Sequence, residues 1–366
     1  MTQRVVVVGG GYGGVAVARA LDDVADVVLV EPKDAFVHSA AALRATVDPQ
    51  WQEHVFFPYD KVLTRGTVRH DRARAVSPGL VRLSATDAIE ADHVVLATGA
   101  AYPFPAKFHE DAVRLAAGRL ERTRADLTTC TRVLVVGAGP SGIELTGELT
   151  AAFPAVAVTI VEKEEDILPG DYLPALRDGI RAQLAQRDVT VLTGTTLSSL
   201  PPSDVGAYQP FRVTTSAGTV IEAEMWFRCH GSRPVTDYLE GQLREQLRGD
   251  GRIHVTEHLN VVGQDRVWAV GDITDVPESK RATAARAHAA VVAQNIRDVI
   301  EGRERSAVYT PAPELVVLAL GPDAGAAQVA RPDGTREVLG PDETSEIKGG
   351  DLFADAIAEL VGVEPD

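Results

Sequence analysis

The chain carries the same glycine-rich turn twice, each time between a short apolar run and the opening of an apolar helix. The first copy, Gly9 to Gly14, follows the run Val5 to Val8, and the second, Gly137 to Gly142, follows Val133 to Val136. Both read G-x-G-x-x-G, a pattern typical of the strand–turn–helix that holds the pyrophosphate of a dinucleotide. In each copy the first glycine permits a tight bend, the second lets the backbone approach the ligand, and the third lets helix and strand pack closely. Two such turns indicate two dinucleotides on one chain, an arrangement that suggests an electron relay from a nicotinamide to a flavin.

An acidic residue ends the next predicted strand after each turn. Glu31 stands 22 positions after Gly9, and Glu162 stands 25 positions after Gly137. A carboxylate at this point accepts hydrogen bonds from ribose hydroxyls and repels the 2′-phosphate of NADPH. We therefore expect Glu31 to hold the first dinucleotide and Glu162 to favour NADH in the second, although the neighbouring Lys163 weakens that preference.

Two further carboxylates each have a structural and a functional interpretation. Glu144 lies in the first turn of the helix after Gly142, where it either complements the helix dipole or lines the nicotinamide pocket. Asp272 follows Gly271 at the end of a buried strand, where it either caps a turn or bonds the ribityl chain of a flavin. We favour the functional role for Glu144, whereas Asp272 taken alone is better explained as a turn residue.

Composition excludes several classes of partner. The formal net charge is −16, which argues against nucleic acid and against tight docking on anionic lipid. No apolar run approaches the roughly 20 residues that span a bilayer. The start, Met1 to Arg4, runs directly into a core strand, so we expect no signal peptide and a cytoplasmic protein. A weak peripheral contact with a membrane stays open.

The cysteines and histidines predict neither dithiol chemistry nor a metal site. Cys130 and Cys229 are far apart, and no CxxC or CxxxxC pair is present. The histidines that could be considered as ligands lack metal-ligand spacing: His38, His109, His230 and His288. We therefore expect buried thiols, packing histidines and no metal.

Strand and helix signals divide the chain into three units. We predict an α/β fold with two Rossmann-like dinucleotide-binding domains, the second inserted in the first, and a small α+β C-terminal domain. The predicted FAD-binding domain is discontinuous, at 1–108 and 245–305, and the predicted NAD(P)H-binding domain covers 109–244. The C-terminal domain covers 306–366, with strand-like pieces before a terminal helix.

Two more motifs complete a resemblance to a known family. With the glycine turns, Ala97-Thr98-Gly99 and Val270-Gly271-Asp272 resemble the pyridine-nucleotide:flavin oxidoreductases with two dinucleotide-binding domains. Within these, the chain resembles the ferroptosis suppressor and apoptosis-inducing factor-like mitochondrion-associated flavoproteins, which are related to type II NADH dehydrogenases. Four stretches of sequence carry this narrower resemblance: residues 33–38 followed by 41–45, residues 96–99 followed by 103–108, residues 142–149, and residues 280–296. Pro277-Glu278-Ser279 departs from the family's Thr-Pro before Lys280.

The resemblance implies bound FAD, oxidation of NADH or NADPH, and transfer of two electrons to a quinone. The residues that it assigns to FAD, together with those of the first turn, are Gly9, Gly11, Tyr12, Gly13, Gly14, Glu31, Pro32, Lys33, Arg44, Ala97, Thr98, Gly99, Gly271, Asp272, Lys280 and Ala282. Those for NAD(P)H are Gly137, Gly139, Pro140, Ser141, Gly142, Glu144, Glu162 and Gly231. Catalytic roles are predicted for Glu144 at the nicotinamide, and for Lys107 and His38, which, like water, could supply protons to the quinone.

Three alternatives to quinone reduction stay open. A reductase of a small iron–sulfur protein would need a basic docking patch, which the acidic composition disfavours. A tailoring oxidoreductase would differ only in using an aromatic metabolite as acceptor. A redox-sensing protein would bind NADH and turn over slowly. For the main interpretation we expect a monomer or homodimer with a quinone or another small-molecule electron acceptor and no nucleic acid.

Overall fold

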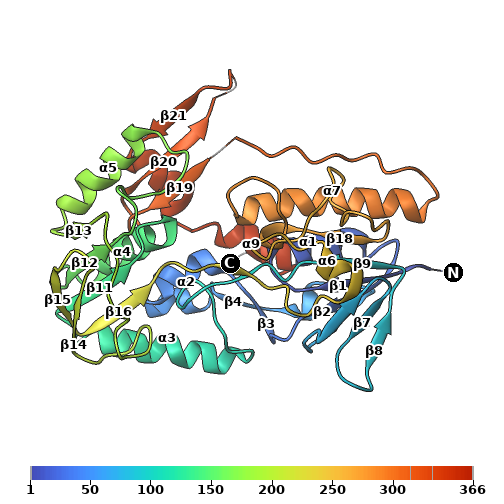
Figure 1. Ribbon diagram of the computed structural model, residues 1–366, viewed down its shortest axis with the longest axis horizontal. Helices are drawn as coiled ribbons and strands as arrows, with labels where there is room; N and C mark the ends of the chain where they lie inside the picture. Colours follow the sequence, from blue (N-terminus) through green and yellow to red (C-terminus); the bar gives the residue numbers. More distant parts are fainter. Residues whose placement is uncertain (1, 314, 332, 365–366) are drawn as a thin grey trace.

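A five-stranded parallel sheet forms the first unit of the computed structural model, which describes residues 2–313, 315–331 and 333–364 (Figure 1). Its strand order is β18-β9-β1-β2-β5. The strands are β1 (Arg4–Val8), β2 (Asp26–Val30), β5 (Thr67–Arg69), β9 (His93–Leu96) and β18 (Val267–Ala269). The strand β18 follows the whole second unit in sequence, yet it pairs with β9. The first domain is therefore interrupted by the second, as predicted; the predicted limits at Met1 and at 365–366 lie outside the described residues.

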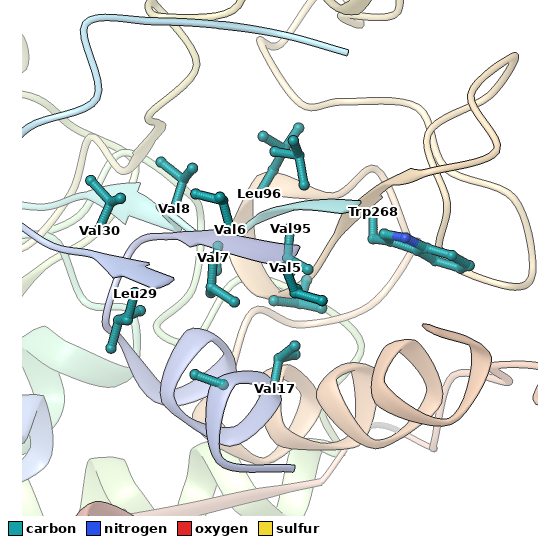
Figure 2. Close-up of a cluster of buried hydrophobic side chains, with 14 of the residues drawn as sticks. Val5, Val6, Val7, Val8, Val17, Leu29, Val30, Val95, Leu96 and Trp268 are labelled. Carbon is teal, nitrogen blue, oxygen red and sulfur yellow. The ribbon is translucent and has the colours of Figure 1, made fainter. Parts of the chain in front are cut away.

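The first sheet is buried on both faces, which explains the continuous valine run in β1. Figure 2 shows Val5, Val7 and Leu29 on the side of two helices, and Val6 and Val8 on the opposite side. The helices are α1 (Tyr12–Leu21) and α7 (Ala282–Ile300). The other face is covered by the meander of β6 (Ala75–Ser77), β7 (Leu80–Arg82) and β8 (Ala88–Glu90), whose apolar residues belong to the same core.

A four-stranded parallel sheet of order β13-β12-β11-β16 forms the second unit. Its strands are β11 (Arg132–Val136), β12 (Ala157–Val161), β13 (Thr190–Leu192) and β16 (Met225–Arg228). One face packs against α3 (Val113–Leu127), α4 (Pro140–Ala152) and α5 (Pro174–Ala185), and the other against the hairpin of β14 (Phe211–Thr214) and β15 (Val220–Ala223). The chain passes between the two units twice, and the two connecting segments pair with each other as the antiparallel strands β10 (Ala100–Ala101) and β17 (Arg233–Pro234). The predicted fold class is thus confirmed, and the residue limits of the domains remain predictions.

The C-terminal unit connects the two dinucleotide-binding units. Its antiparallel sheet has the strands β19 (Val316–Ala319), β20 (Gly325–Ala330) and β21 (Arg336–Leu339). This sheet packs on α4 and α5, whereas the last helix, α9 (Ala354–Val361), packs on α1 (Figure 1). Between them lie α8 (Pro341–Thr344) and a π-helix, Ser345–Gly349. The tail therefore spans the meeting point of both units.

The remaining short elements lie around the first unit. They are β3 (Ala35–Val37), α2 (Ser39–Ala45), β4 (Phe56–Pro58) and α6 (Gly241–Glu245), with 3-10 turns at Pro49–Gln52, Tyr59–Lys61 and Gly271–Ile273. The helix α2 contacts α4 of the second unit. Across the described residues, no helix combines the length and the apolar character needed to cross a membrane.

Gly147 sets how closely the C-terminal sheet approaches α4. A Cβ at this position would lie 2.3 Å from the Cα of Leu320, which is backbone and cannot rotate away. We predict that Gly147→Ala lowers the free energy of unfolding by about 1–3 kcal/mol, because overpacking outweighs the helix propensity of alanine. The matched control is Gly179→Ala in α5, where a Cβ meets nothing within 4 Å. That control should stabilise the protein by roughly 0.5–1 kcal/mol in the same denaturant titration, and equal effects of the two changes would contradict the packing argument.

Candidate functional site

The two glycine turns have matching backbone geometry. Gly9 has φ = 107° and Gly137 has φ = 109°, a region that favours glycine. Their amides donate to the carbonyls that end β2 and β12, at 2.9 and 2.8 Å. A Cβ on Gly14 would lie 1.8 Å from the carbonyl oxygen of Gly9, and one on Gly142 would lie 1.9 Å from that of Gly137. The third glycine of each motif is therefore required by the contact between helix and strand.

The second glycine of each motif leaves the helix terminus open. Gly11 caps α1 and Gly139 caps α4, in both cases without a side-chain hydrogen bond to the first amides. A Cβ at either position would meet nothing within 4 Å. Free amides, the positive end of the helix dipole and an unobstructed approach together fit a pyrophosphate. Gly13 differs, since its Cβ would lie 3.2 Å from the carbonyl oxygen of Ala285 in α7, so this glycine serves the packing of α1 against α7.

The two predicted ribose carboxylates are held by equivalent backbone contacts. Glu31 accepts from the amide of Gly10 at 2.7 Å, and Glu162 accepts from the amide of Ala138 at 2.7 Å. The second oxygen of each accepts the amide two residues further on, at 3.0 Å. A carboxylate has about four acceptor positions, so each retains capacity for ribose hydroxyls. The adjacent Lys33 has its ammonium on the carbonyls of Phe108 and Glu110, away from the glycine turn.

The two units also share a short segment after a neighbouring strand, and the sequence predicted this segment as a motif only in the first unit. A Cβ on Gly9 would lie 2.5 Å from the carbonyl oxygen of Ala97, and one on Gly137 would lie 2.6 Å from that of Cys229. Ala97-Thr98-Gly99 and Cys229-His230-Gly231 therefore stand in equivalent places after β9 and β16. Sequence reasoning missed His230, although the x-x-Gly ending of both strands was a signal that could have found it. The described residues contain no group of three or more His, Cys, Asp or Glu side chains arranged to hold a metal.

Asp272 and Lys107 come together beside the first turn. Asp272 follows β18, and its carboxylate lies 3.8 Å from the Lys107 ammonium. Lys107 also donates to the carbonyl of Ala100 at 2.6 Å. Both side chains are partly exposed, at 26 and 39 %. Lys280 instead donates to the carbonyl of Val276, and burial lowers the pKa of its ammonium. A partly exposed carboxylate and ammonium in this position can bind the polar chain or ring edge of a flavin.

Arg44 joins all three units of the molecule. It is 4 % exposed, and its guanidinium lies 3.0 Å from the carboxylate of Glu148 on α4. It also donates to the carbonyls of Gly349 and Gly350, at 2.7 and 3.3 Å. Burial raises the pKa of Glu148, and the hydrogen bond from Arg44 opposes this. The resemblance puts Arg44 near the flavin; in the structure its donors are directed at the second unit and the tail.

Glu144 is paired with a lysine that sequence reasoning missed. Lys348 Nζ lies 2.5 Å from Glu144 Oε1, and both side chains are largely buried, at 13 and 14 % exposure. Lys348 also donates to the carbonyl of Val317 at 3.1 Å. It is the only lysine after residue 300, a signal that could have singled it out. With Ala40, Leu43 and other residues the pair lines a cavity of about 10 Å³, near the size of one water site, where the three units meet.

His38 is buried with both ring nitrogens in hydrogen bonds. Nε2 lies 2.8 Å from the carbonyl oxygen of Leu352, and Nδ1 lies 2.8 Å from the hydroxyl of Tyr12. Since a carbonyl only accepts, the proton is on Nε2 and Nδ1 accepts from Tyr12. Burial lowers the pKa of His38 to about 4, so the ring is neutral at pH 7. His38 and Arg44 therefore both bind backbone carbonyls of residues 349–352, and these contacts hold that part of the tail at the interface between the units.

Comparison with known proteins identifies the family of this site. A family model described as pyridine nucleotide-disulphide oxidoreductase matches residues 3–291. The chain belongs to this family. The oxidoreductase is 30% identical over 332 residues to human ferroptosis suppressor protein 1, covering 89% of this chain and 88% of that protein. The predicted resemblance is therefore confirmed, and the chain is an NAD(P)H oxidoreductase that uses FAD and NAD(P)H.

Two solved structures share the fold of the oxidoreductase. The sulfide:quinone oxidoreductase from Aquifex aeolicus superposes with a TM-score of 0.75 and 17% identity, covering 98% of this chain and 91% of that chain. NDH2 from Plasmodium falciparum, in complex with NADH, gives a TM-score of 0.72 and 13% identity, with coverages of 95% and 93%. At these identities the likeness shows the fold alone.

Proposed function

We propose that the protein is an FAD-dependent NAD(P)H:quinone oxidoreductase. The balanced reaction takes NAD(P)H, one proton and a quinone to NAD(P)⁺ and a quinol. The observation that carries this proposal is the arrangement of two open dinucleotide turns in adjoining units, with a lysine–carboxylate pair where those units meet the tail. The fold itself is compatible with a quinone acceptor, since a sulfide:quinone oxidoreductase has the same fold.

FAD is proposed to bind at the first turn. When bound, FAD accepts a hydride from the nicotinamide and passes two electrons to the quinone. The amides of α1 hold its pyrophosphate, Glu31 its ribose, and Asp272 its ribityl chain. Tyr59 donates to the carbonyl of Gly10 and lines a depression of about 350 Å³, which gives room for the adenine end. Lys107 holds Asp272 in place and stands at the edge of the same site.

NAD(P)H is proposed to bind at the second turn, with the α4 amides on its pyrophosphate and Glu162 on its ribose. Glu144 lies in the first turn of α4, and its carboxylate faces the unit interface, where it orients the nicotinamide. This carboxylate lies 2.5 Å from Lys348 Nζ and fixes the position of that group at the interface. The protein thus supplies position and electrostatics for hydride transfer, and no acid or base is needed in that half of the reaction.

Quinone reduction consumes protons, and the side chains differ in their ability to provide them. Lys348 is a charged donor beside the interface cavity and is our preferred proton source. Lys107 is more exposed and stands as the second candidate. His38 is neutral at pH 7, and its single N–H is already used on the carbonyl of Leu352, so we give it the role of holding the tail.

The nucleotide preference gives one prediction. Glu162→Gln keeps the acceptor oxygen for the amide of Ala138 but removes the charge that repels a 2′-phosphate. We expect the ratio of kcat/KM for NADPH to kcat/KM for NADH to rise about tenfold. The control is Glu222→Gln, an equal change of charge at an exposed residue of β15 that pairs with Arg132. A wild-type enzyme that already prefers NADPH would contradict the role of Glu162.

Anaerobic double mixing tests the proposed function. The protein is first reduced with NADH and then mixed with a panel of quinones and one-electron acceptors, while the flavin absorption is followed. Rapid reoxidation by quinones with formation of quinol supports the proposal. Rapid reoxidation by iron–sulfur proteins alone would assign the competing reductase function. A long-lived reduced flavin–NAD complex with every acceptor would favour redox sensing over turnover.

A further inference from the structure

Three polar side chains lie beneath Gly271 and Asp272, two of them buried and one partly buried, and the proposed reaction uses none of them. They are Glu278 from the loop before α7, His288 from α7 itself, and Tyr309 from the extended segment that leads to the tail. The side chains of Glu278 and His288 are only 3 and 1 % exposed.

The three side chains form a continuous set of hydrogen bonds. The amide of Gly271 donates to His288 Nδ1 at 3.0 Å. His288 Nε2 lies 2.7 Å from one oxygen of Glu278, and the Tyr309 hydroxyl lies 2.6 Å from the other. The Tyr309 ring packs edge-on against the His288 ring, with centroids 4.3 Å apart. Every polar atom of the cluster therefore has a defined partner.

These contacts fix where the protons are. A backbone amide can only donate, so His288 Nδ1 must accept and the single ring proton must be on Nε2. That N–H points at Glu278, which accepts it and also accepts the Tyr309 hydroxyl, as an ionised carboxylate does. Burial lowers the pKa of His288, which keeps the ring neutral in the same way. The cluster consequently carries one negative charge, located on Glu278.

The nearby cations do not neutralise this charge by direct contact. Lys280 donates to the carbonyl of Val276, and Arg281 donates to the carbonyl of Leu315. Asp272 and Asp275 add further negative charge near Lys280. In the folded protein, a buried carboxylate is therefore fixed behind the loop that presents Asp272.

We propose that Glu278, His288 and Tyr309 form a charged support that fixes the Gly271 amide and lowers the reduction potential of bound FAD. The inference rests on the proposed position of FAD at Asp272. These are positioning residues, since they act through the amide of Gly271, which donates to His288. Reduced flavin carries additional negative charge, and a fixed carboxylate behind the loop raises the free energy of that form more than that of oxidised flavin.

Glu278→Gln tests the charge separately from the hydrogen bonds. The glutamine carbonyl can accept from His288 Nε2, and its amide can donate to the oxygen of Tyr309, so the shape and bonding of the cluster survive. We expect the equilibrium between oxidised and reduced flavin to shift about tenfold toward reduced flavin, a rise of about 30 mV for a two-electron couple. The potential is measured anaerobically by equilibration with a reference dye, in the FAD-loaded protein without NADH or quinone.

Tyr309→Phe gives a second variant with an opposite expected sign. It removes the hydroxyl that partly neutralises Glu278 and keeps the charge, so the potential should fall, by a smaller factor than Glu278→Gln raises it. The control Glu304→Gln removes a charge from an exposed residue of the same segment and should leave the potential unchanged. Shifts of opposite sign support the proposal; no shift, or two shifts of the same sign, overturn it. If the wild-type protein binds no FAD, the proposed function itself is contradicted. If the variants bind FAD and have the wild-type reduction potential, only the present inference is contradicted.

Discussion

Replacing Lys348 by methionine should lower kcat for quinone reduction by about 10²-fold or more, the usual loss when a positioned proton donor is removed. The physical reason is that Lys348 is a charged donor at the cavity where the two dinucleotide units and the tail meet, 2.5 Å from Glu144. Methionine retains most of the length of the side chain but leaves the largely buried Glu144 carboxylate without its ammonium partner. Reduction of the flavin by NADH should change far less, because hydride transfer needs no proton from the protein.

The two half-reactions of this variant are separated by stopped-flow absorption. The first mixing, with NADH, reports flavin reduction, and the second, with quinone, reports reoxidation. Lys61→Met is the control, since it removes an equal charge from an exposed lysine of the first unit. Reoxidation of the Lys348 variant at the wild-type rate would remove this residue from the proton pathway and leave Lys107 as the remaining side-chain candidate.

Breaking the Arg44–Glu148 pair should cost about 3–5 kcal/mol of unfolding free energy for either single change, because each leaves a buried charge without its partner. Arg44→Met leaves the buried Glu148 carboxylate without a cation. Glu148→Met leaves the Arg44 guanidinium without an anion, although the guanidinium still donates to the carbonyl of Gly349. The double variant should lose much less than the sum of the two, since no unpaired charge remains. Chemical denaturation of the four proteins gives the coupling energy directly.

An exposed ion pair provides the control for that cycle. Arg69 and Asp87 lie 2.8 Å apart, but both side chains are 45% exposed. Arg69→Met should change stability by less than about 1 kcal/mol. Additive losses at Arg44 and Glu148 would mean that the two side chains contribute independently, and that the link between the two units and the tail is weaker than the geometry indicates.

Much of the fold could be predicted because its signals are local. A valine run, three glycines and an acidic residue within about thirty positions specify each strand–turn–helix–strand unit, and both units have matching backbone geometry at Gly9 and Gly137. The same local logic found Glu144 on the first turn of α4. The return of β18 to the first sheet was also predictable, since a buried strand ending in Gly-Asp follows the second unit.

The partners of these residues could not be predicted, because they come from distant parts of the chain. Lys348 is 204 positions from Glu144, and the carbonyl of Gly349 is 305 positions from Arg44. No periodicity or spacing encodes such contacts; they arise from the way the tail crosses the interface. The cluster at Glu278 was equally hidden, because its glutamate, histidine and tyrosine lie on three separate elements and are typical surface or packing residues when considered singly.

A nicotinamide bound at the second turn should deliver its electrons to a flavin bound at the first. The most direct measurement is the absorption spectrum of the purified protein before and after anaerobic addition of stoichiometric NADH. We expect a yellow protein whose flavin band is lost within the first seconds of mixing. A protein that stays colourless after incubation with FAD, or whose bound flavin is reduced by neither NADH nor NADPH, would contradict it.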